Sequence, residues 1–350
     1  MKIGVIPENP AEWVLLKTGV VPKPLLETFQ AMLLARTIMA GAKLGVFEAL
    51  AGEPMATDDL AKRIGTDPRA TEKLLNALVG AGYLRHAGGR YSLAPVSRKW
   101  LLPDSEPSLH DNLLFRFLEW ELIGGYEKFV RDGQSANAHE GGFSEEQWNL
   151  YQRGMRSMSG LSAPEVARRM PVPEGATTML DIGGSHGYYS VATCRRHPGL
   201  NATILDLPEA VATSAAILAK EGMGDRVVHR EGNVLTDDLG EGAWDLVFIS
   251  NLVHHFDAPT NRALAKRVAK ALKPGGTLAI LEIIRPESPS AAGQLGALLD
   301  LYFALTSLSG TWTLGEISGW LAGAGLTPGK PIKLMSIPGG AIVHAKKPRA

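Results

Sequence analysis

From about residue 171 onward, short apolar runs alternate with helical stretches, and this alternation limits the folds open to the chain. We expect strands in five apolar runs: TTMLDIGG, NATILDLP, DRVVHREGN, WDLVFISNLVHHF and TLAILEII. Helical stretches separate most of them: YYSVATCRRH, PEAVATSAAILAKEG and TNRALAKRVAKAL. Repeated strand–helix units with almost wholly apolar strands predict an α/β fold around a doubly wound, mostly parallel sheet.

The end of the chain adds a strand that runs the other way. Residues 330–347, KPIKLMSIPGGAIVHAKK, form two strand-like runs around Pro338-Gly339-Gly340, which predicts a hairpin and so an antiparallel last strand. The helix before it begins at Thr313, whose capping box is completed by Glu316.

Residues 1–105 lack this alternation of strand-like and helical stretches, and their pattern predicts a separate, mostly helical domain. A Leu-, Met- and Ala-rich helix follows Pro24, a second helix begins at a Thr57 N-cap and stops at Gly65, and a third begins at Asp67. A hairpin around Gly88-Gly89 completes a winged-helix pattern. The surplus of basic over acidic residues is small, so a dimerisation module is favoured over a DNA-binding one.

Residues 106–170 are expected to be connecting helices. Ser144 and Gln147 have the spacing of a capping box, and the stretch before them is rich in aromatic residues. Aromatic residues at helical spacing are usually core, and the alternative is that some of them line an acceptor pocket beside the next domain, residues 171–350.

Bulk properties exclude several classes of protein. The 36 basic and 36 acidic residues balance, so the whole-chain charge indicates neither nucleic-acid nor anionic-membrane binding. A single cysteine, Cys194, rules out an internal disulfide and a cysteine-based zinc cluster. With no signal peptide and no long apolar run evident, we expect a cytoplasmic protein.

The first strand predicted in the domain of residues 171–350 ends in the glycine-rich turn DIGGSHG. Asp181-x-Gly183-x-x-x-Gly187 is not the dinucleotide fingerprint G-x-G-x-x-G. A carboxylate there would repel a pyrophosphate but suits a cationic amino acid. The next strand ends at Asp206, which can accept both hydroxyls of a ribose. A nucleoside joined to an amino acid fits this turn better than a dinucleotide does.

The segments DIGGSHG, LDLP, EGNV, NLVHHFD, LKPGG and LEIIRP resemble the motif series of S-adenosylmethionine-dependent methyltransferases. With the winged-helix pattern, nearly the whole chain resembles the small-molecule O-methyltransferases of plant caffeic acid and bacterial natural-product pathways. The resemblance implies a Rossmann-like sheet, a homodimer held by the amino-terminal domain, and S-adenosyl-L-methionine as the cofactor.

The resemblance also implies residue roles around the cofactor. Gly183 would lie against its methionine part, Asp206 would bind the ribose, and Gly232-Asn233-Val234 would flank the adenine. Relatives often have Asp at the position of Asn233, and plant members have Lys at the position of Ser250. The contacts of these two residues with the cofactor would therefore differ from those in the relatives. The expected cofactor-binding set is Asp181, Gly183, Gly184, Gly187, Asp206, Leu207, Gly232, Asn233, Val234 and Ser250.

His254 matches the general base of this family. A neutral imidazole can take the hydroxyl proton as the bond to the methyl group forms. Glu282 follows one strand–helix–strand unit later and is expected to orient the imidazole. Plant members have a second carboxylate where this chain has Thr311. Adjacent histidine side chains are expected to diverge, so His255 is expected to be structural and no metal site is predicted.

Two further features concern the ligands. His186, inside the glycine-rich turn, can cap the next helix, contact the cofactor's carboxylate or act as a second titrating group, and the first two roles are favoured. Met155 matches a family position that packs on the acceptor ring. Other candidates by placement for a flat, largely apolar, hydroxylated acceptor are Trp120, Tyr151, Asp300, Phe303 and Trp312.

The sequence therefore predicts a homodimeric O-methyltransferase that acts on a hydroxylated, aromatic small molecule, with His254 and Glu282 as its catalytic residues. Two alternatives remain open at this point. One is a family member that binds the cofactor but catalyses another reaction, and the other, less favoured, is a transcription regulator that senses a ligand.

Overall fold

The computed structural model describes residues 3–136 and 143–349, and it divides into two compact units after Phe117. Helix α8 (His110–Ile123) crosses the division. Each unit has its own buried core. In the part of the chain that the structure describes, no helix is both long enough and apolar enough to span a membrane.

The amino-terminal unit is mostly helical and contains a two-stranded hairpin, as predicted. Its elements are α1 (Pro10–Lys17), α2 (Lys23–Leu25), the π-helix η1 (Leu26–Gln30), α3 (Ala31–Lys43), α4 (Val46–Ala49), α5 (Thr57–Ile64), α6 (Pro68–Gly80), β1 (Leu84–Ala87), β2 (Arg90–Leu93) and α7 (Pro95–Trp100).

Helix starts in this unit follow the sequence signals closely. Asp67 caps α6 as predicted, its Oδ1 accepting the Ala70 N–H at 2.8 Å. The expected Thr57 cap is wrong by one residue, because Ala56 is the N-cap of α5 and no side chain caps that end. Phe47 and Leu60 are fully buried in the core of the unit, which explains why α4 and α5 pack together.

The carboxy-terminal unit contains an eight-stranded sheet with strand order β5-β4-β3-β6-β7-β10-β8, and β9 pairs with β10. The strands are β3 (Thr178–Ile182), β4 (Asn201–Asp206), β5 (Val227–Glu231), β6 (Trp244–Ser250), β7 (Leu272–Ile283), β8 (Thr327–Pro328), β9 (Ile332–Lys333) and β10 (Gly340–Lys346).

The sheet has the predicted mixed topology. Strands β5, β4, β3, β6 and β7 are parallel, and β10 pairs antiparallel with both β7 and β9. The β9–β10 pair, with Ile342 opposite Ile332, is the expected hairpin. The chain leaves β3 toward β4 and later returns to the other side of β3 as β6, so the switch point of the sheet lies beside β3.

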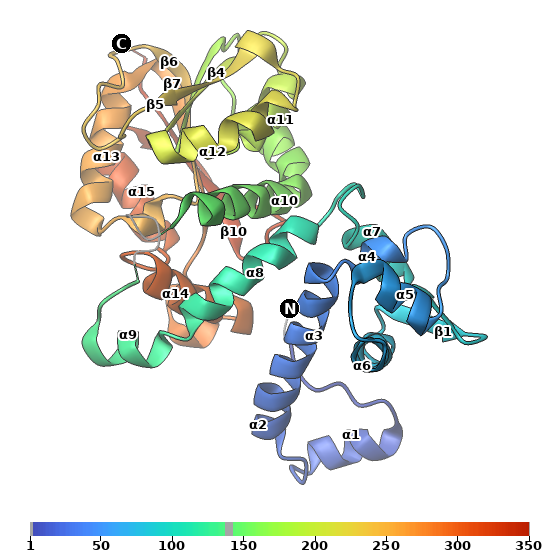
Figure 1. The fold of residues 1–350 in the computed structure, drawn as a ribbon. Coiled ribbons are helices and arrows are strands. Elements are labelled where there is room, and N and C mark those ends of the chain that lie inside the picture. Colours follow the sequence, from blue (N-terminus) through green and yellow to red (C-terminus); the bar gives the residue numbers. More distant parts are fainter. Residues whose placement is uncertain (1–2, 137–142, 350) are drawn as a thin grey trace. The chain divides into compact units, whose positions relative to one another are not determined.

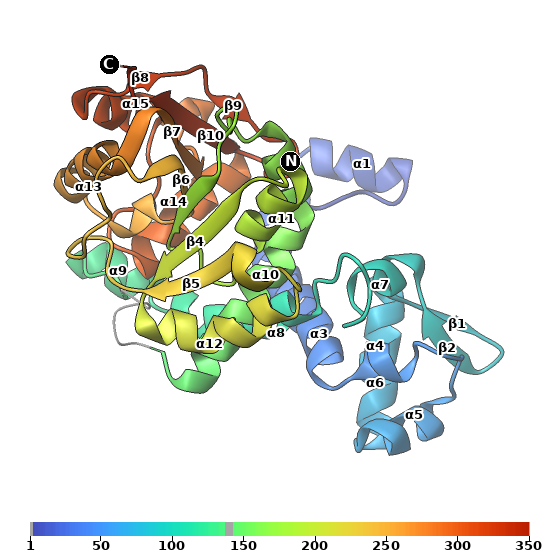
Figure 2. The same cartoon turned by 90° about the horizontal axis from the view of Figure 1, so that it is seen from above.

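Helices cover both faces of this sheet (Figures 1 and 2). The helices that lie wholly in this unit are α9 (Tyr126–Asp132), α10 (Glu145–Arg169), α11 (Tyr188–Arg196), α12 (Pro208–Ala219), α13 (Ala258–Ala271), α14 (Gln294–Thr306) and α15 (Leu314–Gly323). Short 3₁₀ turns are η2 (Gly224–Arg226), η3 (Val253–His255) and η4 (Pro289–Ala291).

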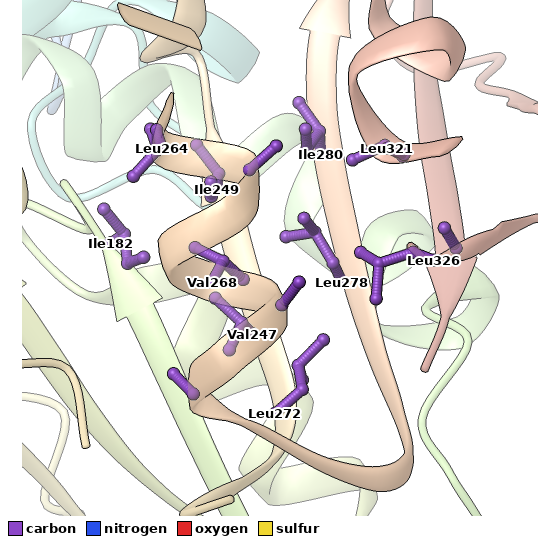
Figure 3. Close-up of a cluster of buried hydrophobic side chains, with 14 of the residues drawn as sticks. Ile182, Val247, Ile249, Leu264, Val268, Leu272, Leu278, Ile280, Leu321 and Leu326 are labelled. Atoms are coloured by element: carbon purple, nitrogen blue, oxygen red, sulfur yellow. The ribbon is translucent and has the colours of Figure 1, made fainter. Parts of the chain in front are cut away.

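Two apolar clusters hold the layers together. On one face, α13 and α15 pack on the strands through side chains such as Val268 and Leu321, which meet Leu278 and Ile280 of β7 (Figure 3). On the other face, α10, α11 and α12 pack on the same sheet, with Val191 among the buried residues. Strands covered on both faces explain the nearly continuous apolar runs in the sequence.

Both predicted capping boxes form. Ser144 Oγ accepts the Gln147 N–H while Gln147 Oε1 accepts the Ser144 N–H, which starts α10. Thr313 and Glu316 do the same for α15. These bonds satisfy backbone groups that the first helical turn leaves unpaired.

Candidate functional site

The glycine turn, residues 183–187, connects β3 to α11 beside the switch point of the sheet. Gly183, Ser185 and Gly187 all have positive φ, at 66°, 54° and 73°. A Cβ on Gly184 would lie 2.6 Å from the Asp181 carboxyl group, and a Cβ on Gly187 would overlap Ile204. The turn therefore needs glycine at these positions and brings its backbone close to the strand ends.

Asp181 is fully buried beneath this turn. Its Oδ2 accepts the Ser190 hydroxyl at 2.6 Å, and its Oδ1 has no hydrogen-bond partner among the described residues. Burial raises the pKa of Asp181 to about 7; the Ser190 bond opposes this rise and the charge of Asp206 adds to it. An unpaired buried carboxylate oxygen next to a ligand-type turn is a site for a cation or a donor.

Asp206, the last residue of β4, faces the same turn. Its Oδ2 accepts the Ser185 N–H and its Oδ1 accepts the Leu207 N–H, both at 2.8 Å. Burial raises its pKa, and these two backbone bonds act against the rise. Each oxygen keeps a lone pair for a further donor, as a ribose hydroxyl would provide.

Helix α10 reaches the glycine turn through a residue that the sequence did not single out. Gln152 is fully buried, and its Oε1 accepts the Ser185 hydroxyl. On the other side of the turn, His229 Nε2 lies 2.8 Å from the Ser185 carbonyl oxygen. Ser185 is thus held through its amide, its hydroxyl and its carbonyl, which stabilises its left-handed backbone conformation.

The structure favours one of the three roles considered for His186. Its Nδ1 accepts the Tyr188 N–H at 3.1 Å, so it caps the first turn of α11. Burial, with the positive charge of Arg156 and the nearby His229, lowers the pKa of His186 to about 3. It therefore stays neutral at physiological pH and does not serve there as a second titrating group.

The segment 232–234 follows β5, at the far side of Asp206. The Gly232 N–H donates to the Asp206 carbonyl at 2.9 Å, and a Cβ at Gly232 would lie 2.6 Å from Asp237 Oδ2. The Asn233 side chain is exposed, but its oxygen already accepts the Leu235 N–H at 2.9 Å. Val234 is buried in the core rather than presented at the surface.

The catalytic candidates meet between two neighbouring strands. Ser250 ends β6, and η3 then carries His254 to within 3.0 Å of Glu282 near the end of β7, measured from Nδ1 to Oε2. Both side chains are buried. The other carboxylate oxygen, Oε1, accepts the Ile283 N–H at 3.0 Å, so Glu282 is fixed at both oxygens.

Two rings lie against His254. Phe303 of α14 stacks on it, with ring centroids 4.1 Å apart and planes 26° apart. The expectation that His255 diverges from its neighbour is wrong, because the 3₁₀ turn brings the two imidazole centroids within 4.4 Å. Among the described residues, no group of three or more His, Cys, Asp and Glu side chains is placed to hold a metal ion.

Two of the residues proposed to contact the methyl acceptor form hydrogen bonds within the protein through their polar side-chain atoms. Asp300 Oδ1 accepts both the N–H and the hydroxyl of Thr311. Trp312 Nε1 donates to the Val253 carbonyl at 3.0 Å, directly before His254. These bonds hold the loop around Thr311, and this loop contacts His254, since the Ser309 N–H donates to the His254 carbonyl.

The remaining acceptor candidates are half-buried side chains of two helices. Tyr151 and Met155 lie one turn apart on α10, and Trp120 lies on α8. Burial raises the pKa of Tyr151, with further contributions from the charges of Asp206 and Glu119. Tyr302 donates to Glu119 Oε1 at 2.6 Å, which ties α14 to α8 beside Phe303.

Comparison with known proteins shows which family the chain resembles. Two family models match: an O-methyltransferase dimerisation domain over residues 26–103 and an O-methyltransferase domain over residues 131–326. A 3-hydroxy-5-methyl-1-naphthoate 3-O-methyltransferase of Streptomyces sahachiroi is 28% identical, over 89% of this chain and 91% of that protein. The tetracenomycin polyketide synthesis 8-O-methyl transferase TcmO of Streptomyces glaucescens is 27% identical, over 87% and 91%.

A solved structure shares the fold along almost the whole chain. Human N-acetylserotonin methyltransferase, solved in complex with SAM, is 20% identical with a TM-score of 0.83, covering 98% of this chain and 99% of that one. The two domain matches cover most of the chain, in the same order as its helical unit and its sheet. The chain therefore belongs to the O-methyltransferase family, and it carries both the dimerisation domain and the methyltransferase domain that these models describe.

Proposed function

We propose that this enzyme transfers a methyl group from S-adenosylmethionine to a hydroxyl of a small aromatic molecule, with His254 as the general base. The buried His254–Glu282 pair carries this proposal. His254 follows β6, and Glu282 lies on the neighbouring strand β7. Strand β6 lies between β7 and β3, the strand that leads into the glycine turn. A cofactor at the turn and a base at the next strand end suit a transfer between two bound molecules.

The residues around the glycine turn fit the proposed cofactor. Positions 184, 187 and 232 leave no room for a side chain, so the backbone there packs directly on residues such as Asp181 and Ile204. The unpaired Oδ1 of Asp181 suits the ammonium group of the amino-acid part. Asp206 suits the ribose hydroxyls. Leu207, Val234 and Ser250 remain proposed contacts of the nucleoside by their positions at the strand ends.

The contribution of this chain's residues to the reaction follows from the histidine pair. When bound, S-adenosylmethionine supplies a methyl group on a positively charged sulfur, which an oxygen nucleophile displaces in line. Glu282 accepts a hydrogen bond from the Nδ1–H of His254, which leaves the Nε2 lone pair to take the hydroxyl proton. The carboxylate also stabilises the imidazolium that forms. General-base catalysis of this kind contributes about 10²–10⁴-fold.

The side chains proposed for the acceptor favour a flat apolar molecule. Phe303 already stacks on the base, and Met155, Tyr151 and Trp120 add polarizable or aromatic surface. Asp300 and Trp312 would act here mainly by holding the Thr311 loop. Two relatives are named for O-methylation of a naphthoate and of tetracenomycin, which supports a phenolic hydroxyl as the acceptor.

We further propose that the enzyme is a homodimer. The dimerisation-domain match begins at residue 26, and the helices around that point carry exposed apolar side chains, among them Phe29, Leu33 and Leu34. Such side chains gain by burial against a second copy of the chain. Sedimentation measurements at micromolar concentration would show the mass of two chains, whereas a single-chain mass would contradict the proposal.

The function is tested by supplying a radiolabelled methyl donor with a panel of phenols and naphthols. We expect label to appear in an O-methyl ether of at least one compound. If the protein binds S-adenosylmethionine but labels no hydroxyl compound, methyl transfer to oxygen is contradicted and a different reaction on the same cofactor is favoured.

A further inference from the structure

Gln152 of α10 presents a buried polar atom that the structure leaves without a partner. Its side chain is fully buried, its Oε1 accepts the Ser185 hydroxyl, and its Nε2 has no hydrogen-bond partner among the described residues. A buried amide nitrogen without an acceptor loses its hydrogen bond to water, so native proteins rarely keep one without a reason. A ligand that supplies an acceptor would remove this cost.

The charges around the glycine turn indicate which acceptor fits. The two carboxylates beneath and beside it, Asp181 and Asp206, can accept hydrogen bonds from the ammonium group and the ribose hydroxyls of the proposed cofactor. The same carboxylates repel the cofactor's own carboxylate, which therefore needs donors. The Ser185 hydroxyl is already donated to Gln152, whereas the two amide protons on Gln152 Nε2 are available.

We propose that Gln152 Nε2 donates a hydrogen bond to the amino-acid carboxylate of the cofactor, and that Gln152 is thus a cofactor-binding residue. The inference rests on the proposed function, because it assumes S-adenosylmethionine at the glycine turn. The Ser185 bond holds the carboxamide in one orientation, so that its nitrogen is turned away from Ser185.

The same side chain connects cofactor binding to the acceptor side. Gln152 lies next to Tyr151 and one turn before Met155 on α10. A hydrogen bond from Gln152 to the cofactor would add to the Ser185 bond in holding this turn of the helix, on which two of the proposed acceptor residues lie.

The test compares two ligands that differ in the carboxylate alone. Affinities for S-adenosylmethionine and for decarboxylated S-adenosylmethionine are measured by titration calorimetry on the full chain and on Gln152→Met. Methionine has nearly the shape of glutamine but no donor. We expect Gln152→Met to weaken binding of S-adenosylmethionine about tenfold or more while changing binding of the decarboxylated ligand less than about threefold. Equal weakening of both ligands overturns the inference.

Two further variants separate ligand contact from folding. Ser185→Gly removes the hydroxyl at a position whose positive φ suits glycine, so it breaks the bond to Gln152 without backbone strain. We expect it to weaken S-adenosylmethionine more than the decarboxylated ligand, because the Gln152 carboxamide is no longer held in the orientation that the carboxylate needs. Gln152→Glu keeps an acceptor for Ser185 but replaces the donor, so it should make the enzyme prefer the decarboxylated ligand. An unchanged preference in Gln152→Glu overturns the inference even if Gln152→Met folds poorly.

The outcomes distinguish this inference from the proposed function. If the wild-type chain binds neither ligand, both fail together. If it binds and transfers methyl groups but Gln152→Met and Gln152→Glu keep the wild-type ratio of affinities, the function stands and the assignment of Gln152 is wrong.

Discussion

His254 Nδ1 lies 3.0 Å from Glu282 Oε2, and both side chains are buried between the ends of adjacent parallel strands. The carboxylate holds the imidazole in one orientation. In the proposed mechanism Glu282 therefore acts through His254, as a positioning residue.

Replacing the carboxylate tests that role. Glu282→Gln keeps the shape of the side chain but removes its charge, so we expect kcat to fall about tenfold to a hundredfold with an unchanged affinity for S-adenosylmethionine. Steady-state kinetics and calorimetry measure the two quantities. A matching loss of cofactor affinity would mean that Glu282 supports the cofactor site instead.

The close packing of the glycine turn predicts a strong effect of one methyl group. A Cβ at Gly184 would lie 2.6 Å from the Asp181 carboxyl group and 2.8 Å from Ile204, so Gly184→Ala should cost about 1–3 kcal/mol of stability and abolish cofactor binding. Gly319→Ala is the control, because nothing lies within 4 Å of its Cβ position in α15. It should stabilise by about 0.5–1 kcal/mol. Urea unfolding of both variants checks the prediction, and similar values for the two would contradict it.

The raised pKa of Asp181 predicts a pH dependence of stability for the free protein. This carboxyl group titrates near 7 in the folded chain and near 3.8 in the unfolded chain, because burial disfavours its charge. The folded chain then binds more protons between these values, so stability falls as pH rises from about 4 to 7, by at most about 1.4 kcal/mol per pH unit.

Asp181→Asn removes that proton uptake. Its melting temperature relative to wild type should therefore rise from pH 5 to pH 7 and then level off, as thermal melts without cofactor would measure. Asp104→Asn, at an exposed position, should show a constant difference over the same range. A constant difference for Asp181→Asn would contradict the assigned burial of its charge.

The hydrogen bond between Thr311 and Asp300 is expected to contribute to the stability of the loop beside His254. Thr311→Val keeps the shape of the side chain and removes the hydroxyl that donates to Asp300, so it should cost about 1–3 kcal/mol of unfolding free energy. Thr236→Val removes an exposed hydroxyl that also donates to a carboxylate, Asp237, and should cost below about 0.5 kcal/mol. Equal costs would show that burial of the Thr311 bond is unimportant.

The sheet and its motifs were predictable because their signals are local. Apolar runs mark strands that are covered on both faces, and both capping boxes form where Ser144 and Thr313 indicate them. The pairing of His254 with Glu282 was also expected, since the motif series resembles a family and one strand–helix–strand unit separates the two residues.

Other features depend on tertiary contacts that the sequence pattern does not reveal. Helix α14 was not predicted, because QLGALLDLYFALT is apolar on most sides and no side chain caps its start. Gln152 was overlooked because a glutamine on a helix usually faces water. His255 was expected to point away from His254, and the 3₁₀ turn of η3 places the two rings together instead.

The most direct measurement is the rate of methyl transfer by His254→Ala, with radiolabelled S-adenosylmethionine and the phenolic acceptor that the screen identifies. We expect kcat to fall about 10²–10⁴-fold while cofactor affinity stays the same, and we expect the neighbouring variant His255→Gln to lose less than about tenfold. Transfer by His254→Ala at the wild-type rate would contradict the general-base assignment.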